Sequence, residues 1–189
     1  MMNDIMVDLE TMDNRATSAI VSIGAVHCNL ITGEIRDEYY RVVNLNGQME
    51  NGMSISPETL YWWLQQSDNA RQAICIEGKI PLEAMCKSFS KWIQTCGPVE
   101  NIRIWGNGAS FDNAIIRQAF AVCKIPFPIP FWQDRDMRTI LGFYPKQLQE
   151  IWRKANLRKG DLHNSLDDAK HQIKYCSHIL QELGVKELY

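Results

Sequence analysis

Two carboxylates stand two residues apart near the start of the chain, at the end of a short apolar run. They are Asp8 and Glu10, within residues 4–11. On a β-strand, positions i and i+2 point to the same face, so both acids would project together from one side of a sheet. Such a pair is unfavourable unless a proton or a cation lies between the carboxylates. Divalent cations such as Mg²⁺ prefer oxygen ligands, so the pair predicts a strand that ends at a metal site.

Strand and helix signals alternate along the rest of the chain. Strands are predicted at 4–10, 19–29, 36–44 and 102–106, with a short strand or turn near 133–138. Helices are predicted at 57–66, 68–76, 81–96, 110–123, 145–155 and 165–183. This order predicts an α/β fold with a mixed central sheet of about five strands, antiparallel on one side and parallel on the other, flanked by helices. Strand 4–10, with the two acids, is expected at the centre, where sites of α/β sheets gather.

Length, charge and cysteine usage limit the class of protein. The 189 residues suit one domain, 1–189. A net charge of −2 argues against a protein that coats duplex nucleic acid with a broad basic face. Six cysteines without a CxxC pair argue against a zinc ribbon and favour a reduced, cytoplasmic protein. No apolar run approaches the roughly 20 residues that cross a bilayer, and the acidic N-terminus does not resemble a signal peptide, so no membrane partner is expected.

Asp112 follows a Gly-rich loop after the predicted strand 102–106. It falls in the first turn of a helix that Ser110 is expected to cap. An acid in a first turn also complements the helix dipole. Alone, Asp112 therefore indicates either a stabilising charge or a metal ligand.

His163 and Asp168 lie around the start of the last predicted helix. Within one continuous helix they would be about 140° apart. Ser165 and Asp168 have the spacing of a capping box, which predicts that the helix begins at this point and that His163 lies in the preceding loop. From that loop, His163 can share a site with Asp168. A solvated histidine beside a capped helix is the alternative.

Two further features are compatible with nucleic-acid binding. Trp62 and Trp63 face about 100° apart on the predicted helix 57–66, so one is expected in the core while the other stacks on a base. Trp63 is taken as the candidate for stacking, although the spacing alone does not choose between them, and core packing of both is the alternative. Arg138, within residues 135–139, offers a bidentate donor to a phosphate or a partner for a surface ion pair.

Taken together, these motifs resemble the DnaQ-like 3′–5′ exonucleases of the ribonuclease H-like superfamily. The resemblance is to the DEDDh subgroup, which has three Asp, one Glu and a catalytic His, and it covers residues 4–180. Its motifs are matched by Asp8 and Glu10, by Asp112, and by His163 with Asp168, where the spacing selects Asp168 over Asp167. Residues 20–26 match the second strand of the family. The tandem Trp62 and Trp63 and residues 105–112 and 135–139 look closest to a phage and bacterial branch that includes dexA-type exodeoxyribonucleases and related exoribonucleases.

The resemblance implies a metal-dependent mechanism of phosphodiester hydrolysis. Two Mg²⁺ or Mn²⁺ ions about 4 Å apart would be bridged by Asp8. Glu10 and Asp168 would complete the first ion site, and Asp112 would support the second. His163 would act as general base on the attacking water. The expected product is a 5′-mononucleotide released from a single strand or a 3′ overhang.

The family also implies where the 3′ end is held. Thr11 would contact the terminal sugar and Met12 would wedge against the terminal base, while Asn107 and Phe111 line the same cleft. The expected partner is single-stranded DNA or RNA with a free 3′ end, because such a site needs unpaired bases. Several members of the family are homodimers, which makes a homodimer compatible with this sequence.

Two other functions remain compatible with the residues. A non-catalytic nucleic-acid-binding module of the same fold is disfavoured, because its carboxylates would repel phosphates without serving a purpose. A metal-dependent endonuclease or nucleotidase would use the same acids, and it differs in its products. An exonuclease leaves circular strands uncut.

Overall fold

A mixed five-stranded sheet forms the centre of the computed structural model, which describes residues 2–75, 79–156 and 163–188. The strands are β1 (Asp4–Thr11), β2 (Ile20–Asn29), β3 (Glu34–Val42), β4 (Arg103–Gly106) and β5 (Asp134–Asp136), and their order is β3-β2-β1-β4-β5. β2 is antiparallel to β1 and β3, whereas β4 is parallel to β1 and β5. The predicted fold class is confirmed, with β1 in the middle of the sheet.

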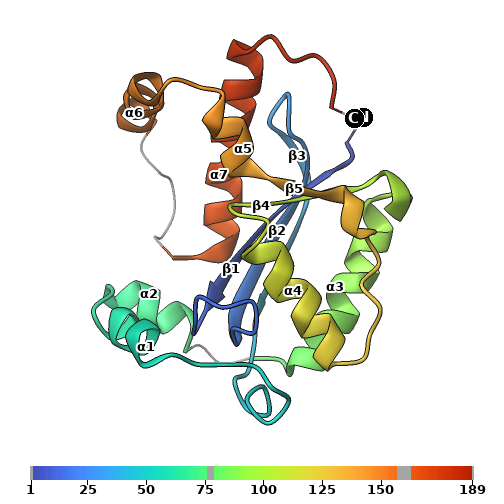
Figure 1. Ribbon diagram of the computed structural model, residues 1–189, viewed down its shortest axis with the longest axis vertical. Coiled ribbons are helices and arrows are strands. Elements are labelled where there is room, and N and C mark those ends of the chain that lie inside the picture. Colours follow the sequence, from blue (N-terminus) through green and yellow to red (C-terminus); the bar gives the residue numbers. More distant parts are fainter. Residues whose placement is uncertain (1, 76–78, 157–162, 189) are drawn as a thin grey trace.

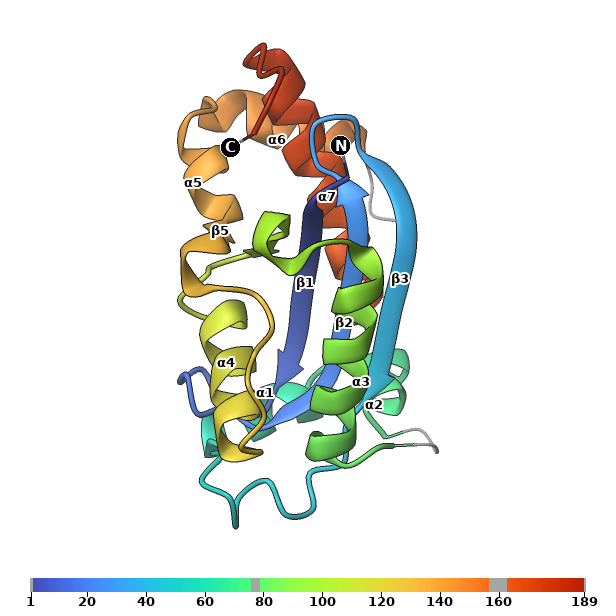
Figure 2. The same ribbon diagram turned by 90° about the vertical axis from the view of Figure 1, so that its right-hand side faces the viewer.

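Helices cover both faces of this sheet (Figures 1 and 2). They are α1 (Pro57–Leu64), α2 (Asp68–Ala73), α3 (Leu82–Cys96), α4 (Asp112–Val122), α5 (Met137–Gly142), α6 (Lys146–Ala155) and α7 (Ser165–Glu182), with short 3-10 turns at Val99–Asn101 and Phe131–Gln133. α3 and α4 pack on one face, and α7 packs on the other together with α5 and α6. In the described part of the chain, no helix combines the length and apolar character needed to cross a membrane.

The alternation of side chains along β1 separates the core from the site. Ile5 and Val7 are buried among residues of α3 and α4, and Met6 is buried on the α7 side. Because side chains alternate with a period of two, Asp8 and Glu10 continue the Met6 face. The acids therefore lie on the face covered by α7.

Small residues on β2 let the first turn of α7 approach the sheet closely. A Cβ atom on Gly24 would lie 2.3 Å from the backbone N of Leu166 and 2.3 Å from the carbonyl carbon of Ser165. The Ser165 hydroxyl, fully buried, is 3.1 Å from the Ser22 hydroxyl. Gly24 is paired with Asp8 across the strands. The start of α7 is thereby held directly beside the acids of β1.

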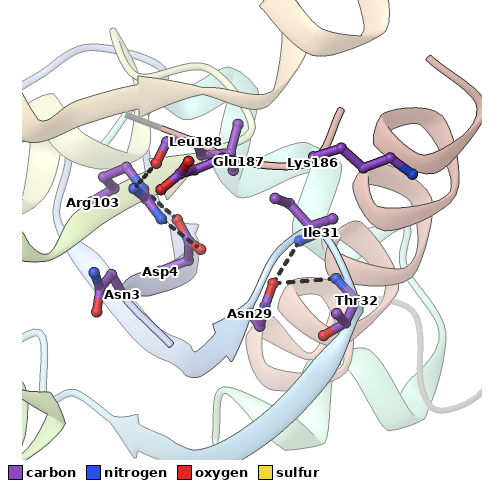
Figure 3. Close-up of a pocket in the computed structure, with 9 residues that line it drawn as sticks. All are labelled: Asn3, Asp4, Asn29, Ile31, Thr32, Arg103, Lys186, Glu187 and Leu188. Atoms are coloured by element: carbon purple, nitrogen blue, oxygen red, sulfur yellow. Dashed lines mark hydrogen bonds and ion pairs between the residues drawn. The ribbon is translucent and has the colours of Figure 1, made fainter. Parts of the chain in front are cut away.

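A buried ion pair neutralises the acid at the opposite end of β1. Asp4 accepts hydrogen bonds from Arg103 Nε at 2.8 Å, from Trp105 Nε1 at 2.9 Å and from the backbone N of Leu30 at 3.3 Å. Arg103 also donates to the carbonyl oxygen of Leu188 at 2.6 Å, which ties the C-terminal segment to the sheet (Figure 3). Asp4 is therefore a structural acid.

The helix starts agree only in part with the sequence predictions. Ser56 caps α1, as predicted, through a hydrogen bond from the backbone N of Thr59. Ser165 does not cap α7, because its hydroxyl is buried against β2; Asn164 caps the helix instead. Ser110 does not cap α4, which begins at Asp112 without a side-chain cap.

One helix was not predicted and another is shorter than expected. α5 begins after Asp136, whose side chain accepts a hydrogen bond from the backbone N of Arg138. The predicted helix 68–76 ends at Ala73, and position 76 lies outside the described residues.

We expect Gly24→Ala to destabilise the fold by about 1–3 kcal/mol, because the new methyl group would overlap the backbone of α7. Gly142→Ala is the matched control, since a Cβ there meets nothing within 4 Å. The control should keep or slightly raise the free energy of unfolding, measured by urea titration. Equal stability of the two variants would contradict the close contact.

Candidate active site

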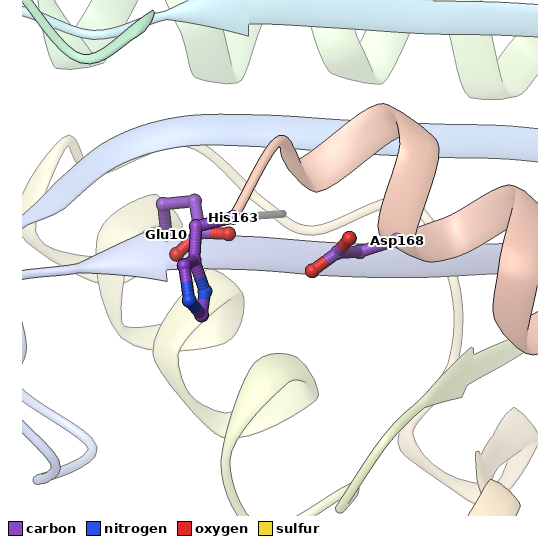
Figure 4. A group of neighbouring side chains, drawn as sticks. All are labelled: Glu10, His163 and Asp168. Carbon is purple, nitrogen blue, oxygen red and sulfur yellow. The ribbon is translucent and has the colours of Figure 1, made fainter. Parts of the chain in front are cut away.

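Three predicted residues converge at the carboxyl end of β1 (Figure 4). One ligand atom each from Glu10, His163 and Asp168 lies within 4.8 Å of the others. Glu10 comes from β1, and Asp168 comes from the first turn of α7. His163 lies in the loop before the cap, with a positive φ of 66°. The predicted loop position of His163 is confirmed, although Asn164 rather than Ser165 is the capping residue.

The tandem tryptophans surround His163. The Trp62 ring packs edge-on against the imidazole with 4.8 Å between centroids, and the Trp63 ring does so at 6.1 Å. Trp63 is only 3% exposed and its Nε1 donates to the carbonyl oxygen of Thr11, whereas Trp62 is 40% exposed. The prediction of a stacking role for Trp63 is therefore wrong on geometric grounds, because its faces are buried. Trp62 is the more exposed of the two rings.

Asp8 is held by a residue that the sequence analysis did not identify. Gln172 Nε2 donates to Asp8 Oδ1 at 2.6 Å. Gln172 lies one helical turn after Asp168 on α7, so the two side chains share a face of that helix. This i, i+4 spacing from a predicted site residue is the signal that would have found it. Asp8 is outside the compact group of Glu10, His163 and Asp168, but it lines a groove with Asp168.

Asp112 is buried beside β1, and the pKa of its carboxyl group is raised. Its Oδ1 accepts a hydrogen bond from the backbone N of Leu9 at 3.3 Å. Burial raises the pKa of Asp112 to about 7, although hydrogen bonds from the Leu9 and Asn107 backbone and the charge of Arg138 act in the opposite direction. Gly106 permits this position, because a Cβ there would lie 2.9 Å from the Asp112 Cβ.

The two residues predicted to hold the 3′ end are both buried. Thr11 uses its hydroxyl to donate to the carbonyl oxygen of Asp13 at 2.9 Å. Met12 belongs to the core cluster on the α3 and α4 side. The packing of Met12 corrects its predicted role as a wedge, because the side chain points into the core rather than into a cleft.

The remaining predicted contacts divide between a groove and the core. Asn107 and Arg138 line a groove of about 410 Å³ together with Asp8 and Asp168. The Arg138 guanidinium carbon lies 3.4 Å from where a Cβ on Gly108 would be, so the absence of a side chain there gives it room. Phe111 is partly buried against the core between α3 and α4, and it does not line this groove.

Comparison with known protein families assigns the chain to one of them. Residues 3–180 match the Rv2179c-like domain, described as a 3′–5′ exoribonuclease domain. The chain belongs to this family. The protein is therefore an exonuclease with a ribonuclease H-like DEDDh fold. No curated protein matches its sequence.

Solved structures of other nucleases share the fold of this exonuclease. The nuclease domain of 3′hExo, a DEDDh family member bound to rAMP, has a TM-score of 0.63 at 15% identity, covering 95% of this chain and 92% of that one. Pop2p of S. pombe, in a form with Mg²⁺ and Mn²⁺, has a TM-score of 0.63 at 14% identity, covering 99% and 86%. E. coli Exonuclease I in complex with a dT13 oligonucleotide has a TM-score of 0.67 at 14% identity, covering 96% and 41%. At these identities the likeness shows the fold alone.

We expect Asp112 to make the metal-free exonuclease less stable as the pH rises. The pKa of this carboxyl is about 7 in the folded chain against an ordinary 3.8. The folded state therefore holds the proton more tightly, and the free energy of unfolding falls between pH 4 and pH 7 before it levels. Urea titrations in EDTA should show this decline, on the order of a few kcal/mol, in the wild type. In Asp112→Asn the free energy of unfolding should change much less with pH. If it falls equally with pH in the variant and in the wild type, Asp112 is not the group responsible.

Proposed function

We propose that this exonuclease hydrolyses single-stranded nucleic acid or 3′ overhangs from the 3′ end, with two divalent cations and with His163 as general base. The observation that carries the proposal is the convergence of Glu10, His163 and Asp168 within 4.8 Å at the carboxyl end of the central strand. The cations would be held by Asp8, Glu10, Asp112 and Asp168. The products would be 5′-mononucleotides.

The donor set fits Mg²⁺ or Mn²⁺. Glu10, Asp112 and Asp168 are all buried at one end of β1. Carboxylates gathered in this way are stable only with compensating charge, and hard divalent cations prefer such oxygen ligands. When bound, the cations would lower the pKa of a water and neutralise charge at the scissile phosphate. Pop2p, a solved structure of similar fold, is described in a form with Mg²⁺ and Mn²⁺ bound.

The side chains around the acids have distinct roles in this proposal. His163 lies beside Glu10 and Asp168, where it would take a proton from the attacking water. Trp62 restricts the imidazole by edge-on packing and leaves the rest of its ring open to a base. Gln172 fixes the orientation of the Asp8 carboxylate.

Substrate contacts are proposed on both sides of the acids. Arg138 and Asn107, which line the groove, would bind phosphate and sugar groups. Thr11, which follows Glu10 directly, would meet the terminal sugar at the carboxyl end of β1. Phe111 would support this end of the cleft from the core.

The family description favours RNA as the substrate. Of the similar solved structures, one carries rAMP and another carries a DNA oligonucleotide, so the fold itself is compatible with both.

The proposed relationship to the phage and bacterial branch rests on the tandem tryptophans and residues 105–112. All six cysteines are free, which fits a reducing compartment such as the cytoplasm. A homodimer is proposed only from the family resemblance.

Removal of the catalytic groups should abolish turnover without unfolding the chain. We expect Asp8→Ala, Asp168→Ala and His163→Ala each to lower kcat by at least about 10²-fold, because each removes a ligand or the base. Asp167→Ala is the matched control and should keep near wild-type activity. The measurement is mononucleotide release from a labelled single strand, with circular dichroism as a test of folding. Near wild-type rates in all three variants would overturn the proposal.

The same assay separates the alternative functions. Matched single-stranded RNA, single-stranded DNA, 3′-overhang duplexes and circular strands are digested side by side with Mg²⁺ and with Mn²⁺. Cleavage of circular strands would indicate an endonuclease. Binding without any metal-dependent cleavage would indicate a non-catalytic module.

Trp62→Leu should raise KM by about 5- to 100-fold if this ring stacks on a base, since one stacked base contributes about 1–3 kcal/mol. Trp62→Phe should restore most of the loss, because a phenyl ring offers a similar face. Trp132→Leu is the control, as Trp132 is exposed on the 3-10 turn Phe131–Gln133. Unchanged KM in Trp62→Leu would contradict the stacking role.

A further inference from the structure

A groove continues from the active-site acids along α7, away from the carboxyl end of β1. Asp8 and Asp168 line its first part, and His171 and Tyr175 line the part further along the helix. We call this feature the α7 groove. α5 contributes Arg138 and α6 contributes Arg153 to its wall.

The direction of this groove follows from the topology. The start of α7 packs on Gly24, whereas Ser177, further along the helix, donates to the carbonyl oxygen of Ile31 beyond the end of β2. Because β2 is antiparallel to β1, α7 runs from the Glu10 end of β1 toward its Asp4 end. The α7 groove and Thr11 therefore lie on opposite sides of the acids. From Asp168 to Tyr175 the helix rises about 10 Å, which equals about three stacked nucleotides at roughly 3.4 Å each.

Arg153 is held in place in this groove by neutral groups, and no acidic side chain of the described residues pairs with it. Its guanidinium lies 5.2 Å from the centroid of the Tyr175 ring, and it donates to Gln149 Oε1 at 3.4 Å. Gln149 is itself fixed, because it accepts from the Tyr175 hydroxyl at 2.9 Å and donates to the carbonyl oxygens of Leu141 and Tyr144. Gln149 thus joins α5, α6 and α7 and positions the arginine.

Both arginines of the groove keep their charge available. Within residues 2–75, 79–156 and 163–188, neither Arg138 nor Arg153 has a carboxylate oxygen within ion-pair distance. In contrast, Arg103 and Arg117 are paired with Asp4 and Asp134. A guanidinium that is oriented but not neutralised suits a phosphate, which it can bind with two parallel hydrogen bonds.

A second observation in the groove also points to a ligand. Gln172 is 6% exposed, and its Oε1 is buried with no hydrogen-bond partner in the part of the chain that the structure describes. Its amide nitrogen is already used on Asp8. A buried acceptor is costly when it stays unsatisfied. A sugar hydroxyl or a base amino group of a bound strand would supply the missing donor.

We propose that the α7 groove binds the strand on the 5′ side of the scissile bond, with Arg138 and Arg153 on successive backbone phosphates. This rests on the proposed function, which holds the 3′ end beyond the acids near Thr11. The ligand is then a single-stranded nucleic acid of at least about four nucleotides. Arg138 acts near the scissile phosphate, and Arg153 acts only on strands long enough to reach it.

The test compares Arg153→Gln with the wild type on a dinucleotide and on a decanucleotide of the same composition. We expect the variant to raise KM for the decanucleotide about 3- to 10-fold, with kcat unchanged and with dinucleotide kinetics unchanged. Arg36→Gln, on the exposed strand β3, is the matched control and should behave as the wild type on both substrates. An equal effect on both lengths, or no effect on either, would overturn the proposal.

Binding without turnover provides an independent measurement. The anisotropy of a fluorescent decanucleotide in EDTA is recorded over a range of salt concentrations. The slope of log K against log salt should fall by about 0.7 in Arg153→Gln, the value for one phosphate contact on a single strand. If the protein shows no hydrolysis, the proposed function fails while this slope still tests the groove. If hydrolysis proceeds but the slope is unchanged, the groove proposal alone fails.

Discussion

The close packing of α7 on β2 is the contact on which the site depends. Gly24 lacks the side chain that would collide with the backbone of Ser165 and Leu166, and Ser22 bonds to the buried Ser165 hydroxyl. Without this approach, Asp168 and His163 would lie away from Glu10. A single position on the neighbouring strand thus determines whether residues about 150 positions apart can share one centre.

The buried carboxylates at the two ends of β1 differ in what compensates their charge. Asp4 is buried with Arg103 and is satisfied by the protein itself. At the other end, Glu10 and Asp168 are buried in one compact group with His163. Asp112 is buried beside the Leu9 backbone, and burial raises its pKa to about 7. Burying these acids is unfavourable, and the divalent cations of the proposed function would compensate their charge. The α7 groove adds the complementary feature, which is two arginines that form no ion pair with a carboxylate among the described residues.

Local signals predicted the elements well and their contacts less well. The strands and the central position of β1 follow from alternation and from the order of elements, and these were confirmed. The capping roles of Ser110 and Ser165 were wrong, because a serine is a cap only if its hydroxyl is not needed elsewhere, and Ser165 is bound to Ser22. α5 was missed because six residues carry too little periodicity to stand out.

By itself, the sequence predicted the residues to which the proposed chemistry is assigned. Period-two alternation places Asp8 and Glu10 on one face, and the spacing of His163 and Asp168 requires a loop before the last helix. Only the tertiary structure decided which tryptophan is exposed, that Met12 lies in the core, that Gln172 contacts Asp8, and that Arg153 lines the α7 groove. The physical reason is that periodicity sets the direction of a side chain within its own element. Its burial and its neighbours are set by packing between elements that are distant in the chain.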